Sequence, residues 1–278
     1  MQKNELKTNM KGTKKMISSM KNAFNVKDQN VLITGGTQGL GLGMVDAFLE
    51  LGAKVGFTGR NVEKAGNVIA EMNKKYPGCV VKYYEADHRK QEDCQKSVDS
   101  FVKDFGKIDT LINNAGAGRG GDAIEFIDND FADWHFTIGL DLTSVFMMST
   151  MVAKRMRDTG GGSIINITSN AGFVVNKPQK MVAYAVAKAG ANHMTEMLAY
   201  EWAPYKIRVN AIAPGYFESG LTPPERGDMM KLWMEMTPTH RQGKPVELGA
   251  LAVYLASEAS EQMTGAILCF DGGYSLAN

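Results

Sequence analysis

The sequence predicts an α/β fold, a doubly wound parallel sheet of seven strands covered by helices on both faces. Two observations predict it: short apolar runs alternate along the chain with stretches of helical periodicity, and a glycine-rich turn follows the first run. Parallel strands joined by right-handed crossover helices bury both faces of such a sheet. The expected strands are Val31–Thr34, Lys54–Thr58, Val80–Tyr84, Ile108–Ile112, Ser163–Thr168, Arg208–Ile212 and Ala266–Phe270.

Length and charge limit the classes of function. At 278 residues, and without a linker rich in proline, glycine and serine, the chain is expected to form a single domain. Its 31 basic and 30 acidic residues give a net charge of +1, so we expect neither nucleic acid nor a membrane as a partner. The cysteines at 79, 94 and 269 lie far apart and form no cluster with histidine, so we expect reduced thiols in a cytoplasmic protein and no metal site.

A basic N-terminal extension, residues 1–25, precedes the domain expected over residues 26–278. It contains six lysines, at positions 3, 7, 11, 14, 15 and 21, and no apolar core suited to a secretion signal or a membrane span. Residues 16–24 hold a short amphipathic pattern. Two interpretations stay open: a disordered basic tail, or a helix that docks on its own or a neighbouring subunit.

The first expected strand runs into a glycine-rich turn, TGGTQGLG, over residues 34–41. A helical pattern with Met44, Val45, Phe48 and Leu49 follows the turn. This order of strand, turn and helix lets backbone N–H groups and the positive end of a helix meet a pyrophosphate, which predicts a dinucleotide site. The expected contacts in the turn are Gly35, Thr37, Gln38, Gly39, Leu40 and Gly41.

Tyr184 and Lys188 lie one turn apart in a predicted helix, and Ser169 lies fifteen residues before the tyrosine. Residues i and i+4 share a helix face, so the Lys188 ammonium can lie beside the Tyr184 hydroxyl and favour the phenolate. Tyr184 is therefore a candidate proton donor and acceptor.

With further motifs, these residues resemble those of the short-chain dehydrogenase/reductase family over about residues 25–278. The likeness includes NNAG at 113–116, GSIINITS at 162–169, Pro-Gly at 214–215 and Asp-Gly-Gly at 271–273. The resemblance implies a Rossmann fold and an NAD(P)-dependent enzyme that interconverts a secondary alcohol and a ketone by hydride transfer. It also suggests a homotetramer or homodimer, assembled through the helices around Tyr184 and the C-terminal strand.

The resemblance implies a role for each motif. Tyr184 would exchange a proton with the substrate oxygen, Ser169 would hold that oxygen, and Lys188 would also bind the nicotinamide ribose. Thr168 is the alternative to Ser169, and only one of the two hydroxyls can serve, because adjacent strand residues point to opposite faces. Further cofactor contacts are implied at Asp87, Asn114, Ala115, Gly116, Pro214 and Gly215.

One position departs from the family pattern. The family usually has an asparagine seven residues after a tryptophan, where it helps to hold a water in the proton relay that runs from the lysine. Counting seven residues from Trp134 gives Asp141, which we take as the relay position. An aspartate can substitute if the main-chain carbonyl is the needed group, but an amide that donates a hydrogen bond is replaced only by a protonated aspartate.

The choice of cofactor is expected at the end of the second strand. An acidic residue there would bind the ribose hydroxyls of NAD, but this chain has Gly59 followed by Arg60. No carboxylate repels a 2′-phosphate and a guanidinium is available to bind it, so NADP is favoured over NAD. The alternative is an Arg60 that is exposed and binds nothing.

Two features disagree about the substrate, a small-molecule ketone or alcohol. The segment 170–183 is longer than in many family members and carries Asn-Lys-Pro-Gln at 176–179, similar to polyol and sugar-acid dehydrogenases. A small helical lid, about residues 217–241, is instead rich in methionine, which suits the wall of a bulky apolar site as in the hydroxysteroid dehydrogenases. Its large apolar side chains are Met229, Met230, Trp233, Met234 and Met236. We favour a bulky apolar substrate such as a hydroxysteroid, with a polyol or a gluconate-type sugar acid as the alternative.

A function of a different class, a dinucleotide-binding redox sensor without catalysis, is the remaining alternative. The intact set of Ser169, Tyr184 and Lys188 argues against it, whereas Asp141 argues weakly for it. An oligomer that binds no cofactor fits poorly with the three glycines at 35, 39 and 41.

Overall fold

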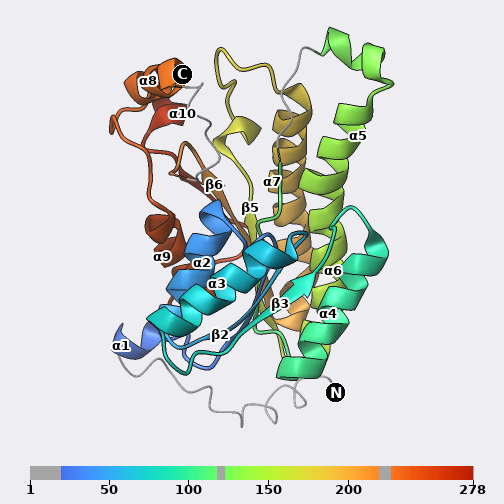
Figure 1. Cartoon of the computed structure of the whole chain (residues 1–278), viewed down its shortest axis with the longest axis vertical. Coiled ribbons are helices and arrows are strands. Elements are labelled where there is room, and N and C mark those ends of the chain that lie inside the picture. The colour runs from blue at the N-terminus through green and yellow to red at the C-terminus, as the bar shows by residue number, and fades with distance from the viewer. Residues whose placement is uncertain (1–19, 118–122, 219–226, 278) are drawn as a thin grey trace, which may run out of the picture.

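One parallel sheet of seven strands forms the middle layer of the structure, with helices packed on both of its faces (Figure 1). The computed structural model describes residues 20–117, 123–218 and 227–277. The strands are β1 Asn30–Ile33, β2 Lys54–Gly59, β3 Val81–Glu85, β4 Thr110–Asn113, β5 Gly162–Ile167, β6 Ile207–Pro214 and β7 Ile267–Phe270. Their order is β3-β2-β1-β4-β5-β6-β7, so the winding reverses between β1 and β4. The doubly wound Rossmann fold is confirmed, and every strand ends within two residues of its expected bounds.

Neighbouring residues on the central strands point to opposite faces, and both faces are buried. Val31 and Ile33 of β1 belong to a core shared with α2, α3 and α9, whereas Leu32 belongs to a second core shared with α4, α6 and α7. The helices that carry the two cores are α2 Gly39–Glu50, α3 Val62–Lys75 and α9 Pro245–Ala256 on one face, and α4 Gln91–Phe105, α6 Ser144–Thr159 and α7 Val182–Trp202 on the other. Because the faces are covered, a ligand can reach the strands at their ends.

Two glycines allow α2 and α9 to pack in close contact. A Cβ atom on Gly249 of α9 would lie 2.7 Å from the Cβ atom of Ala47 in α2, and a Cβ atom on Gly43 would collide with Pro245. This packing fixes the orientation of α2, which begins at Gly39 in the glycine-rich turn. The start of the helix is therefore held in one position relative to the end of β1.

A continuous helical segment runs over residues 132–159, through α5 Ala132–Ile138, η2 Gly139–Thr143 and α6. Within the described part of the chain it is the one helix long and apolar enough to cross a membrane, but half of its most apolar window is buried inside the structure. Such burial is typical of a core helix. The segment η2 is a π-turn, a local widening of the helix that often accompanies functional sites, and it carries the fully buried Asp141.

The remaining helices are short: α1 Met20–Ala23, η1 Ile124–Asn129, η3 Asn170–Gly172, η4 Ala203–Tyr205, α8 Gly227–Met236, η6 Glu258–Ser260 and α10 Tyr274–Ala277. Helices α8 and α10 lie together at the top of Figure 1, where the Tyr216 ring contacts Trp233 and Tyr274. Helix α8 forms part of the expected lid. Residues 219–226 of that lid lie outside the described residues, so the lid stays a prediction.

Most of the expected N-terminal extension, residues 1–19, lies outside the described residues. Its last part packs on the domain: Ala23 is buried, and the centre of the Phe24 ring lies 6.1 Å from that of Tyr254 in α9. Ala23 and Phe24 thus pack on the domain of their own chain, while the division of the chain at residue 25 stays a prediction.

Candidate active site

A cavity of about 490 Å³ lies at the carboxyl ends of the strands, where the winding of the sheet reverses. The expected site residues that line it are Gly35, Thr37, Gln38, Leu40, Gly41, Arg60, Asp87, Asn114, Ala115, Gly116, Asp141, Ser169, Tyr184, Lys188, Pro214 and Gly215. Among the residues expected to bind the cofactor or to act in catalysis, Gly39 alone lies outside this lining, and it begins α2 with a φ of +56°. Motifs that are distant in sequence therefore meet in one crevice.

The Asn114 side chain stabilises the glycine-rich turn between β1 and α2. Its amide nitrogen donates hydrogen bonds to the carbonyl oxygens of Thr34, at 2.9 Å, and Gly35, at 3.0 Å. Gly35 has a φ of +71°, and a Cβ atom on Gly41 would lie 2.6 Å from the same amide nitrogen, so neither position suits a side chain. The first turn of α2 carries no acidic residue, which leaves the positive end of the helix to attract an anion.

The end of the crevice beside β2 is basic. Gly59 ends the strand, and a Cβ atom there would lie 2.9 Å from Cγ2 of Thr37. Arg60 is exposed and lines the cavity. The Lys64 ammonium donates a hydrogen bond to Gln38 Oε1 at 2.9 Å, which brings a second positive charge to the glycine-rich turn. This charge distribution suits a phosphate group on the ribose.

Asp87 follows β3 and lines the same end of the cavity. Its carboxylate accepts hydrogen bonds from Nε of Arg89 at 3.0 Å and from Nη2 at 2.5 Å. These bonds hold the pKa of Asp87 at about 2. Asp87 is therefore ionised at neutral pH and fixed in orientation, and its expected contact with adenine stays a prediction.

His88 is a cavity residue that the sequence did not reveal. Its Nε2 lies 2.6 Å from Thr58 Oγ1, which also accepts a hydrogen bond from the Gly35 backbone N–H at 3.3 Å. Burial lowers the pKa of His88 to about 4, so the neutral ring can accept the Thr58 hydroxyl proton. His88 thus helps to fix the glycine-rich turn. Nothing in the local sequence pattern marks this role, because its partners come from β2 and from the turn after β1.

Lys188 has three polar neighbours although its side chain is almost fully buried. Its Nζ donates a hydrogen bond to the Ile167 carbonyl oxygen at 3.0 Å, lies 3.2 Å from Oδ1 of Asp141, and lies 5.4 Å from the centre of the Tyr184 ring. Burial acts to lower the pKa of Lys188, but the Asp141 carboxylate and the Tyr184 hydroxyl outweigh it and raise the pKa above its ordinary value. Lys188 is therefore a buried cation one helical turn from Tyr184.

The hydroxyl groups of Thr168 and Ser169 have different surroundings. Strand β5 ends at Ile167, and Ser169 caps the following η3 turn, where its Oγ accepts a hydrogen bond from the Ala171 N–H at 3.1 Å. Thr168 Oγ1 instead donates a hydrogen bond to the Ile212 carbonyl oxygen of β6 at 3.2 Å. The Thr168 hydroxyl is engaged within the sheet, so Ser169 is the better candidate for contact with a substrate.

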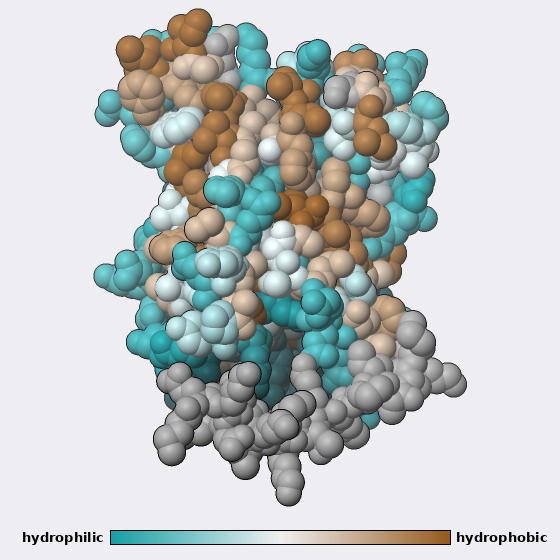
Figure 2. Space-filling view, turned by 180° about the vertical axis from the view of Figure 1, so that it is seen from behind, coloured by the Kyte–Doolittle hydropathy of each residue, from teal (hydrophilic) through white to brown (hydrophobic). Residues whose placement is uncertain are grey.

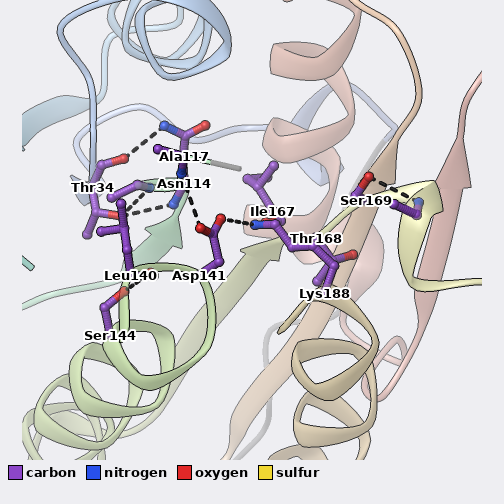
Figure 3. A network of polar contacts seen from close by, with 12 residues as sticks. Thr34, Asn114, Ala117, Leu140, Asp141, Ser144, Ile167, Thr168, Ser169 and Lys188 are labelled. Carbon is purple, nitrogen blue, oxygen red and sulfur yellow. Dashed lines mark hydrogen bonds and ion pairs between the residues drawn. The ribbon is translucent and has the colours of Figure 1, made fainter. Parts of the chain in front are cut away.

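Asp141 faces Lys188 with its carboxylate (Figure 3). Its Oδ2 accepts a hydrogen bond from the Ala117 N–H at 3.2 Å, and its Oδ1 contacts Lys188 as an ion pair without the geometry of a hydrogen bond. A Cβ atom on Gly116 would lie 2.5 Å from Oδ1, so this glycine leaves space for the carboxylate. The side chain at the expected relay position is thus directed at the lysine.

The cavity wall between η3 and α8 carries a cluster of polar side chains beside its apolar ones. Asn176 Nδ2 donates hydrogen bonds to Asn170 Oδ1 at 3.1 Å and to the Tyr216 hydroxyl at 3.4 Å. The Tyr216 hydroxyl donates to Gln179 Oε1 at 3.0 Å, and its ring stacks on Trp233 with 4.5 Å between the ring centres. These five residues line the cavity, which gives a substrate several fixed polar partners.

The sequence-based prediction of the cavity lining is wrong in part. Met230 and Trp233 line the cavity, whereas the other three lid methionines do not. The two lining residues lie three positions apart on α8 and so share one face of the helix. Lys177, expected among the polar residues, is exposed and lies outside the lining.

Comparison with known proteins identifies the family. The family model described as enoyl-(acyl carrier protein) reductase matches residues 35–275. The chain belongs to the short-chain dehydrogenase/reductase family. It is an oxidoreductase of the type that acts on alcohol groups, as the motifs around Tyr184 predicted.

Two relatives and one solved structure are similar over nearly the whole chain. The NADP-dependent mannitol dehydrogenase of Alternaria alternata is 37% identical over 262 residues, which cover 92% of this chain and 96% of the relative. The sorbose reductase sou1 of Schizosaccharomyces pombe is 34% identical over 257 residues, covering 92% and 99%. The crystal structure of the NADPH-dependent 3-quinuclidinone reductase from Rhodotorula rubra has a TM-score of 0.87 and is 33% identical, covering 93% of this chain and 96% of that one.

The variants Ser169→Ala and Thr168→Val test which hydroxyl serves the site. We expect Ser169→Ala to lower kcat/KM for ketone reduction by about 10²- to 10³-fold, because it removes a hydrogen bond to the reacting oxygen. Thr168→Val keeps the side-chain shape and loses one bond within the sheet, so its effect should stay below about tenfold. Steady-state kinetics measures both, with circular dichroism as the check on folding. The reverse order of effects would assign the role to Thr168.

Proposed function

We propose that this enzyme is an NADP-dependent dehydrogenase/reductase that interconverts a secondary hydroxyl group of a polyol and the ketone of the matching ketose. The observation that carries the proposal is the presence of Ser169, Tyr184 and Lys188 beside a polar wall in one crevice. The three residues supply alcohol–ketone chemistry, and the wall selects the kind of molecule that presents the reacting carbon.

The crevice fits a dinucleotide with an additional phosphate. Gly41 and Gly59 pack too closely against Asn114 and Thr37 to carry a side chain, which keeps the glycine-rich turn compact, and the start of α2 suits a pyrophosphate. Arg60 would bind the 2′-phosphate, and the names of the mannitol dehydrogenase and the quinuclidinone reductase support NADP as well. When bound, the nicotinamide supplies or accepts the hydride.

Tyr184 would exchange the proton with the substrate oxygen. In the reductive direction its phenol donates a proton to the ketone oxygen, and in the oxidative direction its phenolate accepts the proton of the alcohol. The Lys188 ammonium, 5.4 Å from the ring centre, stabilises the phenolate by its charge. Ser169 would donate a hydrogen bond to the same substrate oxygen, which orients the reacting carbon.

The polar wall supports a polyhydroxylated substrate. Asn170, Asn176, Gln179 and Tyr216 offer donors and acceptors along one side of the cavity. The amide oxygen Oδ1 of Asn176 is buried and has no hydrogen-bond partner among the described residues, and a steroid-like ketone would leave it so, at a cost of roughly 1–3 kcal/mol. A mannitol dehydrogenase and a sorbose reductase among the relatives also favour the polyol alternative over the hydroxysteroid-type substrate that the lid methionines suggested.

We also infer that copies of the chain assemble into a homotetramer or homodimer through helices beside the site. In the described part of the chain, the large apolar side chains exposed on α6 and α7 are Phe146, Val182, Val186, Met197 and Tyr200. Figure 2 shows apolar side chains gathered in the upper part and along the centre of the face that it displays. An interface over such residues would remove apolar area from water.

A substrate comparison tests the proposed function. With NADPH, we expect D-fructose or L-sorbose to be reduced with a kcat/KM at least about tenfold above that for 2-hexanone, which lacks the additional hydroxyl groups. Tyr184→Phe should lower turnover by about 10²- to 10⁴-fold while NADPH binding and melting temperature are kept. The measurements are NADPH absorbance, NADPH fluorescence and thermal unfolding.

Three outcomes of this comparison would contradict the proposal. Turnover of a steroid ketone without turnover of either ketose would restore the bulky apolar substrate. Preference for 3-quinuclidinone would favour a cyclic ketone, which Met230 and Trp233 could contact. Binding of NADPH with no turnover of any ketone would favour the redox sensor.

Arg60→Ala tests the choice of cofactor. Removing a guanidinium that binds the 2′-phosphate should lower kcat/KM for NADPH by roughly 10- to 100-fold, the amount expected for a charge-assisted hydrogen bond. NADH lacks that phosphate and serves as the internal control, so its kcat/KM should change by less than about threefold. Equal losses with both cofactors, or a wild-type preference for NADH, would remove Arg60 from the site.

A further inference from the structure

The carboxylate of Asp141 forms a fully buried ion pair with the proposed catalytic lysine. The exposed fractions of the Lys188 and Asp141 side chains are 5% and 0%, and Nζ and Oδ1 lie 3.2 Å apart. Burial of a charge is unfavourable unless an opposite charge or hydrogen bonds compensate it. The ammonium has two such partners, the Asp141 carboxylate and the Ile167 carbonyl oxygen, which accepts its hydrogen bond at 3.0 Å.

The chain provides a specific place for this carboxylate. Asp141 lies in the η2 π-turn, and its second oxygen is fixed by the Ala117 N–H at 3.2 Å. On the other side, any Cβ atom on residue 116 would lie 2.5 Å from Oδ1, and that residue is glycine. Figure 3 shows the carboxylate between Ala117 and the end of the Lys188 side chain. The carboxylate is thus held in one orientation, toward the ammonium.

We propose that Asp141 is a positioning residue that fixes the Lys188 ammonium and partly cancels its charge, which favours the phenol of Tyr184 over the phenolate and biases the enzyme toward ketone reduction. The inference rests on the proposed role of Tyr184 in proton transfer. In reduction, a bound nicotinamide would supply the hydride for the new C–H bond, while the Tyr184 O–H bond breaks and its proton forms the O–H bond of the alcohol. Oxidation needs the phenolate at the start, which the negative charge of Asp141 opposes.

Few other charged or titratable groups act on this pair. The described groups with a resolved effect on the Lys188 charge are Asp141, from η2, and Tyr184, from α7 itself. From the segment after β6, Tyr216 lines the same cavity and interacts electrostatically with Tyr184. Asp271, near η3, contacts Asn170 at 3.4 Å rather than the pair. The Asp141 carboxylate is therefore the negative group that can set the balance between phenol and phenolate.

The variant Asp141→Asn tests the inference, because an amide has nearly the same shape and no charge. We expect the acidic limb of the pH profile of kcat for polyol oxidation to move toward lower pH by about one unit. The alkaline limb for ketose reduction should move in the same direction. Asp158→Asn is the matched control, since Asp158 has a side chain that is 60% exposed and lies at the far end of α6, about 25 Å along the helix. Its profiles should stay unchanged.

Two further measurements separate the role of the Asp141 charge from a folding defect and from the identity of the substrate. Asp141→Glu retains the charge and should keep the wild-type limbs even if its activity is lower. Phenolate absorption during a pH titration without substrate, with Tyr184→Phe subtracted, should show the Asp141→Asn shift without any turnover. An active Asp141→Asn enzyme with unshifted limbs, a shift toward higher pH, or a shifted Asp141→Glu profile would overturn the inference. If no polyol or ketose is turned over, the proposed function fails, while the phenolate titration still decides the role of Asp141.

Discussion

The buried ammonium group of Lys188 is the constraint on which the rest of the site depends. A cation removed from water needs close partners, and here they come from three segments: the Ile167 carbonyl at the end of β5, the Asp141 carboxylate in η2, and Tyr184 in the first turn of α7. These groups meet only where the strand end, the π-turn and the start of the helix converge. Gly116 completes the arrangement because it leaves space for the carboxylate. A change in the packing of any of these segments is therefore expected to act on Tyr184, the proposed proton donor.

The segment at the end of β4 connects the two ends of the crevice, the glycine-rich turn proposed to bind the cofactor and the charged pair beside Tyr184. Asn114 holds the glycine-rich turn through its side-chain amide, and two residues later Gly116 borders Asp141. Asn113, the residue before them, donates a hydrogen bond to Asn166 of β5 at 2.9 Å inside the sheet. Four consecutive residues thus fix the turn, the neighbouring strand and the charged pair relative to one another. This explains why the short motif at 113–116 lies beside both the glycine-rich turn and the Asp141–Lys188 pair.

Local information was sufficient to predict most of the fold and much of the site. Strand patterns, the glycine-rich turn and the Tyr184/Lys188 spacing each depend on residues close in sequence. The choice between Thr168 and Ser169 could not be made in this way, because it depends on a carbonyl group of β6. His88 was missed because its partner lies on another strand. The lid methionines misled because an apolar helix does not by itself indicate which face meets the cavity.

The central claim is that the Lys188 cation stabilises the phenolate of Tyr184. The direct measurement is the ultraviolet difference absorption of the phenolate as the pH is raised, in the wild-type enzyme and in Lys188→Met, with Tyr184→Phe subtracted as the background. We predict that Lys188→Met forms the phenolate only in solutions more alkaline by at least about one pH unit. Superimposable titrations of the two folded proteins would contradict the claim.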